Sequence, residues 1–341
     1  MTRSRTRTSN KRTDSERLHI NRLGERGRLL TEQRLAASRR LDRLPIARAF
    51  DVLHREDARI AAAVGAARPA IVRAAARVAE VWRGGGRLFY VGAGTSGRLG
   101  VLDAAECPPT FRSSPEMVQG IIAGGEKALR RAVEGAEDDE SAGVAAMRER
   151  RVGPRDAVFG IATGGTTPFV RAALLEARRR GATTLFLACV PASQAPAEVD
   201  VDIRVLTGPE ALTGSTRMKA GLATKMVLNA VSTLGMVQLG KVYENLMVDL
   251  NSYACRKLTD RATRTVAILT ELTFAEAGEL LRAARGQVKV ALVMHRGRLS
   301  RPAAQDVLSA AGGHVRRALD LISARRTRGG AVAGRGRKRR Q

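Results

Sequence analysis

Short apolar runs of strand length alternate with longer helical segments through the middle of this chain. The candidate strands are residues 87–91, 117–122, 156–162, 183–189 and 202–206. The candidate helices are residues 96–104, 125–136, 167–180 and 217–239. Strands that alternate with helices form βαβ units, which build a parallel sheet covered by helices on both faces. The pattern therefore predicts an α/β fold with a doubly wound parallel sheet, which binds ligands at the carboxyl ends of its strands.

Helical segments flank this alternating region. Residues 46–83 carry apolar side chains at helical spacing, and Gly84-Gly85-Gly86 ends that stretch. Residues 274–323 lack strand signals and repeat their apolar side chains at three and four, which predicts a small domain of three short helices. The expected division of the chain is a basic tail (1–29), the sheet domain (30–270), the helical domain (271–325) and a second basic tail (326–341).

The charge of the chain is concentrated at its ends. The net charge is +26, but the first 40 residues hold 12 basic and 4 acidic side chains, and residues 324–341 hold 8 basic and no acidic ones. The two ends thus supply 16 of the 26 units. We expect them to be disordered tails that attract polyanions weakly and lose them as salt rises. Only 3% of the residues are aromatic, which argues against a base-stacking platform for nucleic acid.

Cysteine and histidine placement argues against metal binding. Cys107, Cys189 and Cys255 are far apart, odd in number and without a C-x-x-C partner, and the four histidines show no metal-ligand spacing. No apolar run approaches transmembrane length, and the Arg-rich N-terminus lacks the apolar stretch of a secretion signal. We therefore expect a cytoplasmic protein with reduced thiols, no metal site and no membrane contact.

The most informative loop follows the strand-like residues 88–91. Gly92, Gly94 and Gly97 allow a sharp turn and close approach to a ligand, while Thr95 and Ser96 add hydroxyl donors. The helix after the loop would point its first N–H groups into it, an arrangement that suits a phosphate. A plain tight turn remains the alternative, because glycine loops after strands are common.

Two familiar nucleotide motifs do not fit this loop. The glycine spacing matches G-x-G-x-x-G, but Asp103 lies too close to serve as the ribose-binding acid, and no Gly-Lys-Ser/Thr follows. Glu106 follows the expected short helix, and Pro108-Pro109 is expected to stop helical continuation. A carboxyl group near a phosphate cradle indicates chemistry on a phosphorylated small molecule.

Several strings, in chain order, resemble one family. G-A-G-T-S-G-R-L-G-V-L-D-A-A-E-C-P-P-T (92–110) is similar to the signature of the N-acetylmuramic acid 6-phosphate etherases, members of the sugar isomerase (SIS) superfamily, which also includes the glucokinase regulatory protein. Further matching strings are T-E-Q-R-L-A-A-S-R-R-L-D-R-L-P (31–45, with Thr31 and Glu32), I-A-G-G-E (122–126), A-V-E-G-A-E-D (132–138), T-G-S-T-R-M-K-A-G (213–221), K-x-x-L-N (225–229) and N-L-M-V-D (245–249). Their joint occurrence over roughly residues 30 to 320 is specific, although no single string would be.

The resemblance implies a flavodoxin-like SIS sheet, a C-terminal bundle of the ubiquitin-associated type, and a homodimeric lyase of cell-wall amino-sugar recycling. That enzyme eliminates D-lactate across C2–C3 of N-acetylmuramic acid 6-phosphate and then adds water, giving N-acetylglucosamine 6-phosphate. The resemblance also implies that Glu106 and Glu137 are the acid/base pair. We assign Glu106 to protonating the ether oxygen and later activating water, and Glu137 to removing the C2 proton; the two roles can be exchanged. Neither step needs a metal or a redox cofactor.

Two loops are expected to hold the phosphate. The expected contacts are Gly94, Thr95, Ser96 and Gly97 in the first loop, and Thr163, Thr166 and Thr167 in the second. The second loop departs from the family, because the usual A-A-S-G-R-T-P reads A-T-G-G-T-T-P at residues 162–168. Gly164 replaces a serine and Thr166 replaces an arginine, and loss of the forked guanidinium should weaken or re-aim the site. Further departures at residues 189–191 and 251–258 bear, like this one, on the substrate rather than the fold.

A hydroxyl cluster is expected to open the long helix 217–239. Ser215 or Thr216 is the predicted cap, and Lys219 adds positive charge. Capping alone would explain the hydroxyls, whereas the resemblance favours contacts to the sugar phosphate from Ser215, Thr216 and Lys219.

Three other functions compete with the lyase. A non-catalytic sugar-phosphate sensor like the glucokinase regulatory protein would fit the altered second loop, but both Glu106 and Glu137 are retained. An aldose–ketose isomerase needs the same proton abstraction without a leaving group, so release of lactate separates the two. Nucleic-acid binding ranks last, because no recognition-helix motif accompanies the basic tails.

Overall fold

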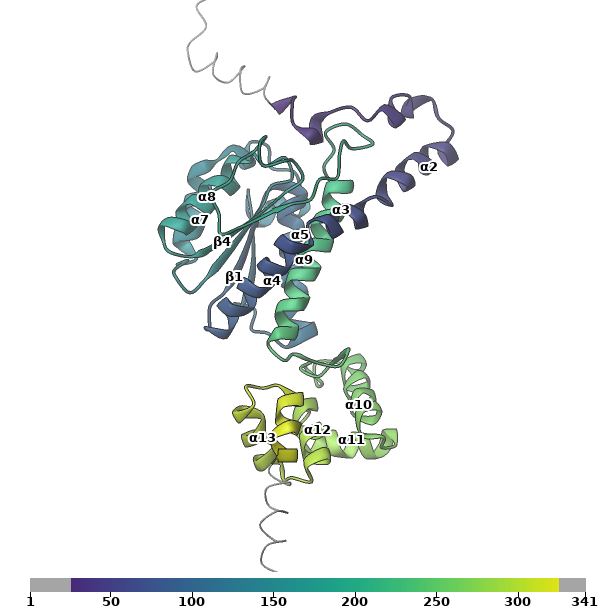
Figure 1. Cartoon of the computed structure of the whole chain (residues 1–341), viewed down its shortest axis with the longest axis vertical. Coiled ribbons are helices and arrows are strands. Elements are labelled where there is room, and N and C mark those ends of the chain that lie inside the picture. Colours follow the sequence, from purple (N-terminus) through teal and green to yellow (C-terminus); the bar gives the residue numbers. More distant parts are fainter. Residues whose placement is uncertain (1–25, 325–341) are drawn as a thin grey trace, which may run out of the picture.

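The computed structural model describes residues 26–324, so the predictions made for the rest of the two tails lie outside the described residues (Figure 1). Five parallel strands form one sheet in the order β2-β1-β3-β4-β5. The strands are β1 (Leu88–Gly92), β2 (Val118–Ile122), β3 (Ala157–Ile161), β4 (Thr183–Ala188) and β5 (Val201–Arg204). The predicted doubly wound sheet is confirmed, with strand bounds within about two residues of those expected.

Helices cover both faces of the sheet because β1 is apolar on both. Leu88 and Tyr90 point to one core and Phe89 and Val91 to the other, as a strand's alternation requires. The first face is covered by α4 (Arg68–Arg83), α5 (Gly94–Phe111) and α9 (Lys219–Gln238). The second is covered by α7 (Glu140–Glu149) and α8 (Pro168–Arg179). Helix α7 was not predicted.

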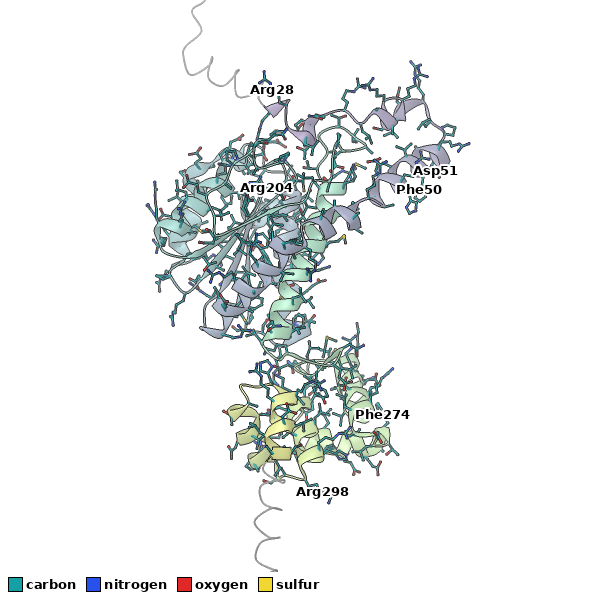
Figure 2. The ribbon with its side chains drawn as sticks, viewed as in Figure 1. Arg28, Phe50, Asp51, Arg204, Phe274 and Arg298 are labelled. Atoms are coloured by element: carbon teal, nitrogen blue, oxygen red, sulfur yellow. The ribbon has the colours of Figure 1, made fainter. Side chains whose placement is uncertain are left out.

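Short elements complete the sheet domain: η1 (Leu30–Glu32), η2 (Ala36–Ser38), η3 (Leu41–Arg43), α2 (Ile46–Asp57), α3 (Ile60–Ala66), α6 (Glu126–Arg130) and η4 (Ala136–Asp138). Helix α2 extends away from the sheet, and Phe50 projects from it into solvent (Figures 1 and 2). Leu29, assigned to the tail from sequence, is 6% exposed and belongs to the second core. The ordered domain therefore begins before residue 30.

The C-terminal helices form a core of their own. A short hairpin of β6 (Val242–Tyr243) and β7 (Leu246–Met247) leads into α10 (Arg256–Thr270), α11 (Phe274–Ala283), α12 (Val288–Gly297), α13 (Arg301–Ala310) and a helical stretch over 315–324. Buried side chains of this core run from Val248 to Ile322 and include three residues of α10. The helical domain therefore starts about 20 residues before the predicted boundary at 271 and has more than the three helices predicted.

Two helices differ from the predictions at their ends. The predicted helix 125–136 ends early, since α6 stops at Arg130 and the chain is extended at Arg131. The predicted helix 96–104 continues to Phe111, so Glu106 lies inside α5 and Pro108-Pro109 does not stop it. Cys107 and Phe111 are buried one helical turn apart, and we attribute the continued helix to this packing. Helix α9 is long and apolar enough to cross a membrane. However, Ala220, Ala223 and Val227 are fully buried inside the sheet domain, as in a core helix.

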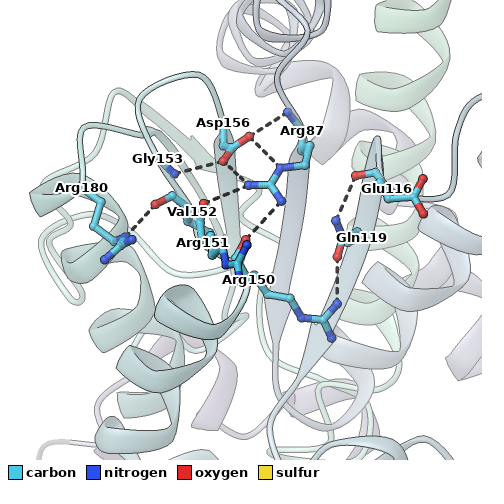
Figure 3. A network of polar contacts seen from close by, with 9 residues as sticks. All are labelled: Arg87, Glu116, Gln119, Arg150, Arg151, Val152, Gly153, Asp156 and Arg180. Carbon is cyan, nitrogen blue, oxygen red and sulfur yellow. Dashed lines mark hydrogen bonds and ion pairs between the residues drawn. The ribbon is translucent and has the colours of Figure 1, made fainter.

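An ion pair between the half-buried Arg87 and the buried Asp156 fastens the amino-terminal edge of the sheet (Figure 3). The Arg87 guanidinium donates to both carboxylate oxygens of Asp156, at 2.7 and 3.1 Å, and its backbone N–H donates at 3.0 Å. The same guanidinium donates to the carbonyls of Arg150 and Arg151, while Gly153 donates its N–H to Asp156. The pair therefore ties the turn that precedes β3 to the start of β1.

Arg87→Met should lower the free energy of unfolding by about 2 kcal/mol at pH 7, since it leaves a buried carboxylate short of its donors. Burial alone would raise the pKa of Asp156, but the hydrogen bonds from Arg87 and Gly153 outweigh it and hold the pKa below its ordinary value. An acid with a depressed pKa stabilises the fold above its unfolded pKa and loses that contribution as pH falls. Urea melts of both proteins should therefore converge below about pH 4; a pH-independent difference would contradict this role.

Candidate functional site

The candidate site lies where the strand order reverses. Strands β1 and β3 are neighbours in the sheet, but the chain leaves β1 for β2 on one side and β3 for β4 on the other. The loops after such a pair of strands diverge and leave a crevice at their carboxyl ends. Both loops singled out from the sequence, after residues 88–91 and after 156–162, follow these two strands.

The first loop leads directly into α5, whose start carries free donors. The helix begins at Gly94, its N-cap Ala93 offers no side-chain cap, and Thr95 and Ser96 form its first turn. The first N–H groups of a helix have no partner inside it and carry partial positive charge. Ser96 is nearly buried and Thr95 half-buried. The turn therefore offers backbone donors and two hydroxyls to an anion.

Two of the loop's glycines serve packing rather than ligand approach. A Cβ on Gly97 would lie 2.7 Å from the carbonyl oxygen of Gly92 and 2.6 Å from the side chain of Ile122. A Cβ on Gly92 would meet the backbone of residues 96 and 97 at under 3 Å. Gly94 differs, with a φ of +52° and open space at its Cβ position. Only Gly94 needs glycine for its backbone conformation.

The second loop, residues 163–167, is held by hydrogen bonds to its backbone carbonyls and presents free hydroxyl groups. The carbonyl of Gly165 accepts from Arg171 of α8 at 2.9 Å, and the carbonyl of Thr163 accepts from the Cys189 N–H at 2.7 Å. Within residues 26–324 the hydroxyls of Thr166 and Thr167 make no hydrogen bond, and both residues are half-buried. Sequence reasoning missed Arg171, which lies five positions beyond the arginine that the family resemblance would place at 166.

The third segment, residues 213–221, meets the first loop. A Cβ on Gly221 would lie 3.4 Å from both the carbonyl oxygen of Thr216 and the methyl of Thr95. The N-terminal segment covers this region, since a Cβ on Gly214 would lie 2.9 Å from the Glu32 carboxylate. Ser215 and Thr216 are half-buried beside it. Loops far apart in sequence thus gather at one edge of the sheet.

The predicted cap of α9 is wrong. The helix begins at Lys219, and Met218 occupies the N-cap position without a side-chain cap. The buried Glu210 carboxylate instead accepts from the N–H groups of Lys219 and Ala220, at 3.0 and 2.9 Å. Burial raises the pKa of Glu210, although these N–H groups oppose the shift. The Glu210 carboxylate thus caps α9 in place of the predicted hydroxyl of Ser215 or Thr216. The spacing of residues in the sequence does not reveal this pairing.

Lys219 is buried away from the hydroxyl cluster. Its side chain is 3% exposed and its ammonium lies 2.7 Å from the carboxylate of Glu56 on α2. Arg59 lies 3.0 Å from the other oxygen of the same carboxylate. The charge of Lys219 is therefore neutralised by Glu56 inside the protein, which removes the reason for predicting a contact between this lysine and the substrate.

Glu137 lies in η4, next to the N-terminal segment. Its side chain is 50% exposed and lies 3.7 Å from the Arg26 guanidinium. The adjoining residues 28–30 are pinned by Gln194, which accepts from the Leu30 N–H and donates to the Arg28 carbonyl. Leu29 in turn lies beside Gly164 of the second loop. Glu137 is therefore linked, through the N-terminal segment, to the edge that carries the two candidate-site loops.

Glu106 lies elsewhere on α5. Ten residues separate it from Ser96, which is about 15 Å along a helix. Its carboxylate is 61% exposed and lies 3.4 Å from the Lys225 ammonium of α9. No hydrogen bond or ion pair joins Glu106 to Glu137 among the described residues. That the two carboxylates act together stays a prediction.

A buried polar cluster supports Glu106 from beneath. Asp103, one helical turn earlier, accepts from the Tyr90 hydroxyl at 2.9 Å and the Ser232 hydroxyl at 3.3 Å, and Lys225 lies 3.8 Å away. Burial raises the pKa of Asp103, and burial beside Asp103 raises that of Tyr90 well above its ordinary value. Lys225 therefore bridges a buried and an exposed carboxylate. Lys225 opens the string K-x-x-L-N at 225–229, which was recognised in the sequence, but the lysine itself was not predicted to belong to the site.

Two family models match the chain. The model of the glucokinase regulatory protein N-terminal SIS domain matches residues 70–178, and that of the SIS domain matches residues 134–234. Both matches fall on the sheet domain described above. Among solved structures, the Vibrio vulnificus NanR protein complexed with ManNAc-6P aligns over 67% of this chain and 74% of its own, with a TM-score of 0.34 and 16% identity.

Curated relatives match almost end to end. An N-acetylmuramic acid 6-phosphate etherase of Gloeobacter violaceus is 55% identical over 89% of this chain and 99% of its own length. That of a Synechocystis species is 52% identical over 87% of this chain and 97% of its own. That of a Nostoc species is 53% identical over 87% and 96%.

Proposed function

Since the chain belongs to the N-acetylmuramic acid 6-phosphate etherase family, we propose that it cleaves the D-lactyl ether of N-acetylmuramic acid 6-phosphate. The observation that carries this is an identity of 55% to such an etherase over 99% of the relative's length. The chain is accordingly a carbon–oxygen lyase. Its products are N-acetylglucosamine 6-phosphate and D-lactate, and we place the reaction in the cytoplasm, in the recycling of cell-wall amino sugars.

The proposed reaction needs one base and one acid. A carboxylate removes the C2 proton, which the open-chain aldehyde acidifies, and a carboxylic acid protonates the ether oxygen at C3 as the C3–O bond breaks. Water then adds to the resulting double bond, activated by the carboxylate that gave up its proton. Glu106 and Glu137 are our candidates, with Glu106 acting on the ether oxygen and Glu137 on C2, or the reverse.

The phosphate is proposed to bind the first turn of α5 and the hydroxyls of the second loop. Free N–H groups, Thr95 and Ser96 support the first contact, and Thr166 and Thr167 support the second. Ser215 and Thr216 would bind the sugar from the third segment. Lys219 is left out of this proposal because Glu56 neutralises it inside the fold.

A homodimer is proposed because Glu106 lies about 15 Å along α5 from Ser96, on an exposed part of the helix. It lies on an uncovered face of α5 and α9 that also exposes Leu102, Leu222 and Met226, at 43%, 49% and 40%. A second copy seated on this face would bury these apolar side chains and bring Glu106 towards the partner's loops. Mixing Glu106→Gln with Glu137→Gln protein, after exchange of subunits, should then restore activity. Two carboxylates acting within one chain would give no restoration.

Incubation with N-acetylmuramic acid 6-phosphate, followed by an enzymatic assay for D-lactate, tests the function. Lactate should appear together with N-acetylglucosamine 6-phosphate. Binding without lactate would favour the sugar-phosphate sensor, and an aldose–ketose conversion without lactate would favour the isomerase. Either result would overturn the proposal.

Ser96→Ala should raise KM for the phosphorylated sugar roughly tenfold, the scale of one hydrogen bond to a charged group, and leave kcat nearly unchanged. Steady-state kinetics with N-acetylmuramic acid 6-phosphate measure both constants. Unphosphorylated N-acetylmuramic acid should compete poorly with the substrate in the wild-type enzyme. Equal competition would show that the first loop does not recognise phosphate.

A further inference from the structure

A second cavity lies far from the candidate site, where the end of α5 meets the C-terminal helices. Its volume is about 200 Å³, and Arg112, Asp249, Gln287, Lys289 and Gln305 supply its polar lining. Arg112 ends the helix whose first turn carries Thr95, about 25 Å away along the helix axis. In Figure 1 the C-terminal helices lie beyond the lower ends of α4 and α9, away from the loops of the candidate site.

Cations outnumber anions around this cavity. The Asp249 carboxylate lies between two ammonium groups, 2.7 Å from Lys241 and 2.9 Å from Lys289. The Arg112 guanidinium makes no hydrogen bond or ion pair with any residue in the range 26–324. Of the charged residues that line the cavity, Arg112 and Lys289 are positive and Asp249 is negative, and the Arg112 guanidinium is available to a ligand.

The pKa of His314, near this cavity, is also affected by positive charges. The pKa of His314 lies below its ordinary value because of burial first, and then because of the positive charges of Arg317, Lys289 and Arg83. Arg83 comes from the sheet domain, and the other two come from the C-terminal helices. Cations from both domains therefore converge on this junction.

Hydrogen-bond donors also converge on the cavity. Gln287 is the N-cap of α12 without capping it, and residues 288–290, the first turn of that helix, line the cavity. Their N–H groups have no partner inside the helix. The side-chain amides of Gln287 and Gln305 make no hydrogen bond within the described part of the chain. A ligand rich in acceptor oxygens would satisfy these groups.

We propose that this cavity binds a small oxyanion, a phosphate or carboxylate group, held by Arg112 from the sheet domain and by Lys289 and the first turn of α12 from the C-terminal helices. The volume is below the range of 300 to 1,000 Å³ typical of drug-sized ligands, so the ligand is an inorganic ion or an acid of a few carbons. Binding would join α5, which carries Glu106, to the C-terminal domain.

Calorimetric titration with inorganic phosphate tests the proposal. The wild-type chain should show a phosphate site whose Kd rises roughly tenfold or more in Arg112→Gln, the scale for one lost charge-assisted hydrogen bond. Arg298→Gln is the matched control, because Arg298 also ends a helix in the left-handed conformation, with φ 52° against 51° for Arg112. The Kd in this control should equal that of the wild type. A parallel titration with D-lactate distinguishes a carboxylate ligand from a phosphate.

Ser96→Ala separates this cavity from the substrate site. The substitution should weaken only the binding of phosphate at the first loop, and it should leave the Kd of the Arg112-dependent site unchanged. Gln305→Glu is a second probe that keeps Arg112 in place, and its added negative charge should also weaken binding. The proposal fails if neither anion binds, if all binding depends on Ser96, or if either Arg112→Gln or Gln305→Glu binds like the wild type.

Discussion

Glu106→Gln and Glu137→Gln should each lower kcat for lactate release by roughly 100-fold or more, the usual effect of losing a general acid or base. The amide keeps the shape of the side chain but neither accepts nor delivers a proton at the required step. Both carboxylates are at least half exposed, so the fold should tolerate the change. Initial rates of D-lactate formation at saturating substrate measure the effect.

Glu134→Gln is the control for this pair. Glu134 is exposed and three residues before Glu137, so its loss changes the local charge equally without touching the proposed chemistry. It should keep wild-type kcat, and all three variants should keep their affinity for N-acetylglucosamine 6-phosphate. Wild-type turnover in either Glu106→Gln or Glu137→Gln would remove that residue from the mechanism.

Gly97→Ala should lower the free energy of unfolding by about 3 kcal/mol, the upper range for overpacking a rigid core site. The added methyl would press on the carbonyl oxygen of Gly92, which is backbone and cannot rotate away, and on Ile122. Either β1 and α5 separate or the helix shifts. Urea denaturation followed by far-ultraviolet circular dichroism measures the loss.

Gly65→Ala provides the matched comparison. Gly65 also lies in a helix, α3, but a Cβ there meets nothing within 4 Å. Alanine should stabilise this variant by up to about 1 kcal/mol, because it favours the helix more than glycine does. If Gly97→Ala melts like the wild type yet binds sugar phosphate poorly, the glycine serves ligand approach rather than packing.

The sheet could be predicted because each strand carries its own local signal. Residues 88–91 and 157–161 are apolar on both faces and bounded by glycine-rich turns, so strand length and parallel pairing both followed. Helix α7 escaped prediction because only two of its ten residues are buried, Gly143 and Met147, and only Met147 carries an apolar side chain there. An apolar stripe that narrow gives little periodicity to detect.

The site was less predictable because its partners come from distant parts of the chain. The Pro-Pro pair after Glu106 is a strong local signal for a helix end, and tertiary packing of Phe111 overrides it. Lys219 looked available in sequence, but Glu56, 163 positions away, neutralises it. Spacing along the chain singled out the loops, and the family resemblance singled out the acidic side chains; neither indicated which of them lie together.

The Arg87–Asp156 pair has a consequence for how this chain can vary. It fastens β1 and β3 at their amino-terminal ends, whereas the two candidate-site loops leave the carboxyl ends of the same strands, about 15 Å away. Gly164 and Thr166 of the second loop stand where the family motif has other residues. Changes at these positions therefore leave the Arg87–Asp156 ion pair intact. A chain built this way can exchange ligand contacts at one edge while its folding is secured at the other, so new substrate preferences are accessible through single substitutions.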